Sequence, residues 1–122
     1  TNTWSPGPNL TLGLGRCGCA AIPISSSRIL IIGGTRDIFD ESHLSTTEVL
    51  DLASGTCTPG PDMSCSRQVC SAVMLSDGRV LVIGGMRNTN SSLSTTEVLD
   101  FTSGTSSPGP EMNTARKGTS AV

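Results

Sequence analysis

The sequence predicts an all-β protein assembled from repeated units of four antiparallel strands. The main support is an internal repeat, because the octapeptide LSTTEVLD at residues 44–51 returns unchanged at residues 93–100. Other markers recur in the same order at a spacing of about 50 residues, as in repeat architectures. They are Ile-Gly-Gly, at residues 32–34 and 83–85, and Pro-Gly-Pro, at residues 6–8, 59–61 and 108–110. In addition, no run of ten or more residues has the apolar spacing of a helix.

The second repeat unit displays the expected strands most clearly. We expect them at residues 69–75, 79–83 and 95–101, with a brief fourth segment near Thr105. Between the first two, Ser-Asp-Gly at residues 76–78 supplies the positive φ that a tight hairpin turn needs. Three serines at residues 25–27 take that place in the first unit, with weaker turn chemistry. The run Val-Leu-Val-Ile at residues 80–83 is apolar throughout, which indicates a strand covered on both faces.

Composition excludes several classes of protein. With 35% hydrophobic and 15% charged residues, the 122-residue chain is too apolar and too weakly charged for a disordered protein. A net charge of −2 provides no basic surface for nucleic acid. The longest apolar runs, such as residues 29–32, are far too short to span a bilayer. We therefore expect no nucleic-acid partner and no membrane span.

Taken together, these motifs resemble kelch repeats, the blades of a β-propeller, with the galactose oxidase-type propellers as the most similar group. The family pattern places a double glycine after the second strand, and Gly33-Gly34 and Gly84-Gly85 match it. The resemblance implies blades of four antiparallel strands, with the ring completed by residues or copies not shown. A closed propeller takes four to eight blades. Both a longer chain and several associated copies would complete such a ring.

The chain departs from the family at its aromatic positions. Leu50 and Leu99 stand where the pattern has tyrosine, and Cys57 and Ser106 stand where it has tryptophan. Only Trp4, in a preceding partial unit, keeps the tryptophan. Since these aromatic rings pack between blades in the family, other contacts are expected to compensate for their loss.

The repeat divides the chain into five segments. Two are full blades, and the other three are partial blades or linkers. In order they are residues 1–16 (outer strand and linker of a preceding blade), 17–58 (first blade), 59–68 (linker), 69–107 (second blade) and 108–122 (linker and inner strand of a following blade).

Five cysteines are many for a cytosolic protein of this size and an odd number for a disulfide framework. No CxxC pair occurs, so a zinc site is not expected. A disulfide between Cys57 and Cys65, eight residues apart, is the preferred pairing. Cys19 and Cys70 hold equivalent places in successive units and fit equally well as small buried apolar residues. The sequence leaves the connectivity open.

Several polar residues follow the repeat and therefore indicate blade construction. Glu48 and Glu97 recur, as do Arg16, Arg67 and Arg116, and we expect hydrogen bonds or ion pairs between strands and loops. Because catalytic carboxylates would more often break a repeat than follow it, no catalytic residue is assigned. By resemblance, the copper chemistry of galactose oxidase-type enzymes needs tyrosine ligands, and this segment has no tyrosine.

A second polar group lies in the loop at residues 36–44. Asp37, Asp40, Glu41 and His43 could in principle hold a metal ion, but the matching loop at residues 87–93 carries asparagines and serines instead. A solvated loop is the preferred interpretation. No metal ion or other cofactor is expected in this segment.

Two N-glycosylation sequons begin at Asn9 and Asn90, both in predicted loops. With the cysteines, they favour an extracellular or cell-surface location. The preferred function is a non-enzymatic propeller scaffold that binds protein or glycan through its loops, or a structural unit of a glycoprotein assembly. Two alternatives remain open: part of a galactose oxidase-type copper enzyme whose ligands lie outside this segment, and an intracellular kelch adaptor.

Overall fold

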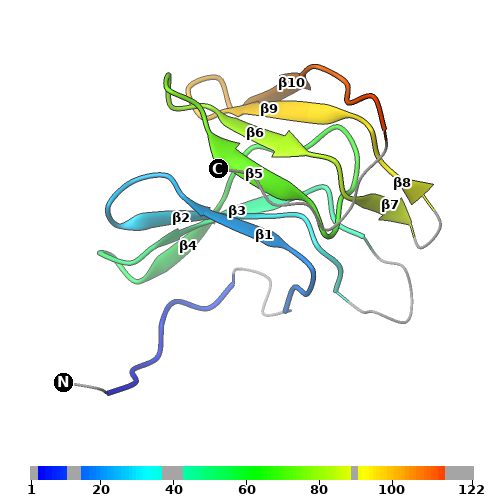
Figure 1. Ribbon diagram of the computed structural model, residues 1–122. Helices are drawn as coiled ribbons and strands as arrows, with labels where there is room; N and C mark the ends of the chain where they lie inside the picture. The colour runs from blue at the N-terminus through cyan, green and yellow to red at the C-terminus, as the bar shows by residue number, and fades with distance from the viewer. Residues whose placement is uncertain (1–2, 11–14, 37–42, 89–90, 115–122) are drawn as a thin grey trace.

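A computed structural model describes residues 3–10, 15–36, 43–88 and 91–114. Two four-stranded antiparallel sheets form most of it, one above the other in Figure 1. The first sheet contains β1 (Ala20–Pro23), β2 (Arg28–Ile32), β3 (Thr47–Asp51) and β4 (Thr56–Pro59). The second contains β5 (Ser71–Met74), β6 (Val80–Ile83), β9 (Thr96–Asp100) and β10 (Thr105–Pro108). The prediction of an all-β fold with four-stranded antiparallel blades is confirmed.

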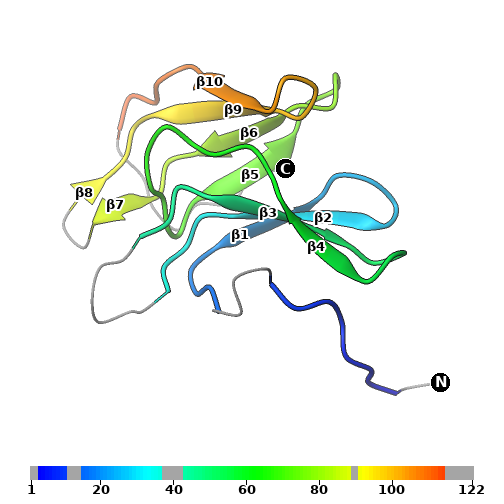
Figure 2. The ribbon, with the colours of Figure 1, turned by 180° about the vertical axis from the view of Figure 1, so that it is seen from behind.

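In each sheet the strands lie side by side in chain order, β1-β2-β3-β4 and β5-β6-β9-β10. The first strands of the two sheets, β1 and β5, contact each other, as the innermost strands of neighbouring blades would. Figure 2 shows the connection that leaves β4 and crosses to the second sheet. No helix that could span a membrane occurs in the part of the chain that the structure describes.

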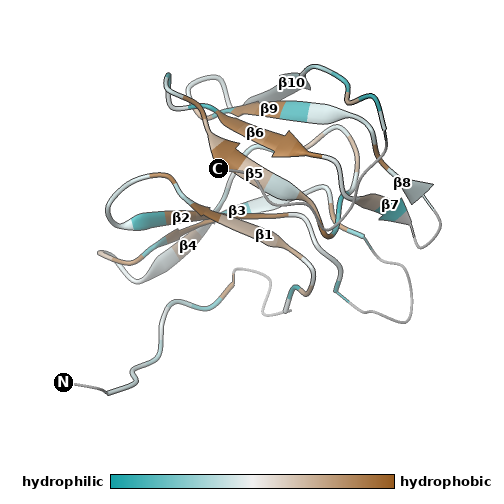
Figure 3. Cartoon of the chain, viewed as in Figure 1, coloured by the Kyte–Doolittle hydropathy of each residue, from teal (hydrophilic) through white to brown (hydrophobic). Residues whose placement is uncertain are grey.

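The hydrophobic core lies between the two sheets. Each sheet turns one face of alternating apolar side chains toward the other, as a pleated strand requires, and Figure 3 shows the apolar residues on β2, β5 and β6. Burial of each such side chain stabilises the fold by about 1.5–3 kcal/mol. The most deeply buried apolar residues are Leu30, Ile32 and Val49 from the first sheet and Val80, Val82 and Leu99 from the second.

Two local features differ from the strands expected from sequence. Val69 lies outside β5 because its φ of 53° is left-handed, and its N–H donates to the carbonyl of Gly18, 2.7 Å away. A small extra hairpin of β7 (Met86–Asn88) and β8 (Ser91–Ser92) follows β6. Its residues have no alternating apolar pattern, which is why this hairpin was not expected.

Candidate functional site

Arg67, in the linker between the sheets, is the most deeply buried charged residue, with 1% of its surface exposed. Its Nε donates to Glu97 Oε2 at 2.8 Å, in a pair whose side chains are almost fully buried. Its two terminal nitrogens donate to the carbonyls of Gly84 and Thr95 and to the Thr95 hydroxyl. All three nitrogens are therefore satisfied by the second sheet and its loops, as a buried guanidinium requires.

The backbone of the same residue is bound to the segment between β2 and β3 of the first unit. The Arg67 N–H donates to the Leu44 carbonyl at 3.1 Å, and its carbonyl accepts from the Gly34 N–H at 2.7 Å. Arg67 thus holds one blade through its main chain and the next through its side chain. We call Arg67 and its bonds to Leu44, Gly34 and Glu97 the arginine clasp.

The same arrangement recurs one repeat earlier. Arg16 Nε donates to Glu48 Oε2 at 2.6 Å, and its terminal nitrogens donate to the Gly33 carbonyl and to the carbonyl and hydroxyl of Thr46. These partners are the repeat equivalents of those of Arg67. The expected bonding of the recurring arginines and glutamates is therefore present in both units, while Arg116 lies outside the described residues.

The double glycines allow the linker to approach this closely. Gly33 and Gly34 have φ values of 60° and 93°, and Gly84 and Gly85 have 60° and 96°. A β-carbon on Gly33 would lie 2.1 Å from the Arg67 carbonyl oxygen, and one on Gly85 would lie 2.7 Å from the Gln68 carbonyl oxygen. These positions therefore need glycine for both conformation and space.

The Glu97 carboxylate is held in its charged form. Burial raises its pKa, but hydrogen bonds from the Ser64 N–H, at 2.6 Å, and from Arg67 outweigh that effect, so the pKa lies below its ordinary value. In the unfolded chain, glutamate titrates near pH 4.3, at about its reference value. Folding therefore gains stability from this group above that pH and loses it as the pH falls through the lower folded-state pKa.

We expect the free energy of unfolding to fall as the chain is acidified below about pH 5, partly because Glu97 must then be protonated. Denaturant unfolding measured at a series of pH values checks this. In Glu97→Gln, the acid-induced loss should be smaller, although the variant is less stable at neutral pH. The exposed Glu111 provides the control Glu111→Gln, which should keep the wild-type pH dependence. An unchanged acid profile in Glu97→Gln would contradict this role.

All five cysteines are free in the structure, and their environments differ. The Cys57 thiol donates to Glu48 Oε1 at 3.4 Å, whereas the Cys65 thiol donates to Glu97 Oε2 at 3.7 Å. The two sulfurs thus lie against carboxylates of different sheets, and the Cys57–Cys65 disulfide stays a prediction. Cys70 is buried, and its desolvation raises the pKa of the thiol to about 11.

Thiol alkylation should therefore be ordered by exposure. In the folded chain at neutral pH, iodoacetamide is expected to modify the exposed Cys17 quickly and Cys70 only after unfolding, because the thiolate is the reactive form. Peptide mass mapping over time measures both rates, and Cys17→Ser should remove only the fast phase. Comparable rates at the two residues would contradict the burial of Cys70. A Cys57–Cys65 bond would appear as two positions labelled only after reduction.

His43 joins the two repeat units. Its Nδ1 lies 2.5 Å from the Arg87 carbonyl, and its Nε2 lies 3.0 Å from the Gln68 side-chain nitrogen. Because a carbonyl can only accept, Nδ1 carries the proton and Nε2 accepts from the amide. His43 therefore differs from the solvated loop residue expected, while Asp37, Asp40 and Glu41 lie outside the described residues. Within the described ranges, no three potential metal-ligating residues come together.

The positions of the missing aromatic residues face the gaps between units. Leu99 is fully buried, and Ser106, its partner across β9 and β10, is half-buried on the same face. Leu50 and Cys57 form the equivalent pair in the first sheet and are both half-buried. Trp4 is fully exposed.

Of the two sequons, Asn9 is exposed and Asn90 lies outside the described residues.

Two grooves, which the sequence did not reveal, recur at equivalent places of the repeat. One is bordered by the Pro-Gly-Pro of residues 59–61 together with Phe101 and Gly104. The other is bordered by the Pro-Gly-Pro of residues 6–8 together with Leu52 and Gly55. The hairpin turns at residues 25–27 and 76–78 differ in charge, because Ser26 stands at the position of Asp77. This difference could have drawn attention to the first groove.

Two four-stranded antiparallel sheets with adjoining first strands and a recurring inter-sheet clasp define a segment of a β-propeller. Residues 16–64 and 69–113 both match the Kelch motif family, and the chain belongs to that family. This bears out the resemblance to kelch repeats.

Similar proteins include oxidases. A galactose oxidase of Gibberella zeae is 29% identical over 91 residues, which cover 70% of this chain and 12% of the relative. The chain thus spans about an eighth of the length of the curated relatives it matches. The solved structure titled "Novel fungal alcohol oxidase with catalytic diversity among the AA5 family, in complex with copper" matches with a TM-score of 0.73 and 20% identity. The match covers 83% of this chain and 23% of that chain, and the similarity is one of fold.

Proposed function

We propose that this chain is part of a non-enzymatic, extracellular kelch propeller that serves as a rigid scaffold for protein or glycan binding. The arginine clasp carries the proposal. Arg67 fixes the first unit against the second through its main-chain bonds to Leu44 and Gly34 and its ion pair with Glu97. The Arg16–Glu48 pair repeats the side-chain part of this arrangement one unit earlier. In such a scaffold we expect the loops at residues 36–44 and 87–93 to contact the partner.

The outer face of the second sheet favours association with a further blade or with another copy of the chain. Leu30, Ile32 and Val49 are buried by the second sheet. Their repeat equivalents Leu81, Ile83 and Val98 are only half-buried. Because exposed apolar surface of this kind favours association, a third blade or another copy would cover it as the second blade covers the first.

Production of the chain in a secreting host tests the proposal. We expect a native assembly larger than one chain and a mass that decreases after enzymatic removal of N-glycans. Asn9→Gln is the matched control for one glycan. A stable, unglycosylated monomer that binds neither protein nor glycan would overturn the proposal.

A second candidate is part of a copper-dependent alcohol oxidase. The similarity to galactose oxidase favours it. Copper analysis and an assay for hydrogen peroxide with primary alcohols, applied to the native protein that contains these residues, separate the two candidates. Bound copper with peroxide release would establish the enzyme, and the absence of both would favour the scaffold.

A further inference from the structure

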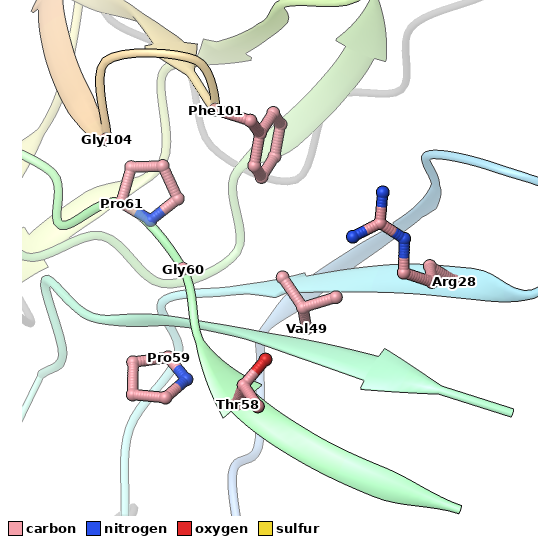
Figure 4. A pocket seen from close by; sticks show the side chains of 8 residues that line it. All are labelled: Arg28, Val49, Thr58, Pro59, Gly60, Pro61, Phe101 and Gly104. Carbon is pink, nitrogen blue, oxygen red and sulfur yellow. The ribbon is translucent and has the colours of Figure 1, made fainter. Parts of the chain in front are cut away.

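The first of the two grooves lies between the sheets and has a volume of about 340 Å³. Figure 4 shows side chains from both sheets around it. Val49, Pro59 and Pro61 supply aliphatic surface, and Phe101 supplies an aromatic ring from the end of β9. Arg28, at the start of β2, is the cationic residue at its border. Thr58, Gly60 and Gly104 complete the border. The groove therefore combines a mixed polar and apolar lining with one positive charge.

Arg28 differs from its repeat equivalent in having no acidic partner. Arg79 forms an ion pair with Asp77 at 2.8 Å within its own hairpin turn. Serine stands at the equivalent position in the first unit, Ser26, and within the described residues no carboxylate forms an ion pair with Arg28. The guanidinium at the groove is thus available to an anion.

The acid directly opposite Arg28 in the sheet already accepts hydrogen bonds from the backbone. Asp51 is the cross-strand partner of Arg28, but its Oδ1 accepts hydrogen bonds from the backbone N–H groups of Ala53 and Ser54, at 3.0 and 3.2 Å. Those bonds hold the carboxylate in the β3–β4 turn. An external carboxylate would therefore meet an Arg28 side chain that no neighbour in the described chain occupies.

We propose that this groove binds a small aromatic carboxylate. The carboxylate pairs with Arg28, since guanidinium and carboxylate form charge-assisted hydrogen bonds. The aromatic body lies against Phe101 and the two prolines, because aromatic rings prefer offset-stacked or edge contacts with one another. The charge of Arg28 selects an acid over the matching neutral amide.

The second groove provides an internal comparison. It has the equivalent Pro-Gly-Pro and a volume of about 440 Å³, but Leu52 replaces Phe101, and no arginine borders it among the described residues. The two grooves share the proline motif and the second is the larger, so neither feature favours binding at the first. The proposed specificity depends on Arg28 and Phe101, so binding is expected only at the first groove.

Naphthoate is the probe, titrated into the full 122-residue chain with backbone amide NMR as the readout. Saturable changes in amide chemical shift are expected at Gly60, Phe101 and Gly104, which border the first groove. None is expected at Gly7 or Gly55, which border the second. Arg28→Gln should weaken binding about fivefold, the size of an exposed charge pair. Ser26→Asp should weaken it similarly, because the new carboxylate would hold Arg28 as Asp77 holds Arg79. Arg79→Gln is the matched control and should bind as the wild type does.

Naphthamide tests the role of charge without any change to the protein. It should bind about fivefold more weakly than naphthoate to the wild type and equally to Arg28→Gln. Equal affinity of acid and amide for the wild type would overturn the proposal, and so would unchanged binding in Arg28→Gln or shifts at the second groove. The thermal unfolding of each variant confirms that it is folded. The comparison of acid and amide on the wild type needs no variant, so the test survives a variant that fails to fold.

Discussion

Replacement of Arg67 by methionine is expected to lower the free energy of unfolding by about 3–5 kcal/mol. The cause is the carboxylate that remains. Glu97 would keep its buried position with only the Ser64 N–H as a strong donor. The Gly84 carbonyl would lose the Arg67 donor, and the Thr95 carbonyl would keep only the Gly84 N–H. Denaturant unfolding of Arg67→Met and of the wild type, at neutral pH, measures the difference.

The matched control is Arg79→Met, which removes an ion pair of similar length from an exposed turn. We expect a much smaller change than in Arg67→Met, because exposed pairs contribute little to stability. The double variant Arg67→Met, Glu97→Met removes both charges, and it should be more stable than Arg67→Met alone. A loss in Arg67→Met no larger than in Arg79→Met would show that the arginine clasp does not hold the blades together.

Much of the fold was predictable because its determinants are local and repeated. The last five residues of the octapeptide at 44–51 form β3, and those of its copy form β9 with the same register to the neighbouring strand. The recurrence of Arg16 and Arg67 with Glu48 and Glu97 indicated pairing, although the sequence did not assign the partners. Repetition reveals such contacts because every unit must make them.

Contacts that occur in one unit only were not predictable. His43 bonds to Arg87 and Gln68, and no equivalent histidine exists in the second unit to give a pattern. The positive charge at the groove depends on the lack of an acidic residue in the turn before Arg28, since Ser26 stands where the other turn has Asp77. Both features need the spatial juxtaposition of two units, which a pattern within one unit does not contain.

The second large effect is expected at the first glycine of the double-glycine motif. Gly33→Ala should lower the free energy of unfolding by about 2–5 kcal/mol, from about 1–2 for the left-handed conformation and about 1–3 for overpacking. The new β-carbon would meet the Arg67 carbonyl oxygen and the Met63 methyl group. The Arg67 carbonyl cannot simply move aside, because it accepts the Gly34 N–H. Urea unfolding of the variant measures the loss.

Gly55→Ala separates conformation from space. Gly55 has a φ of 70°, similar to that of Gly33, but a β-carbon there would meet nothing within 4 Å. The free energy of unfolding of Gly55→Ala should therefore fall by only about 1–2 kcal/mol, the cost of a left-handed alanine. The difference between the two variants isolates the contact between Gly33 and the arginine clasp. Equal losses would mean that the double glycine serves backbone conformation alone, and that the close approach of the linker at Arg67 adds nothing to the stability of the propeller.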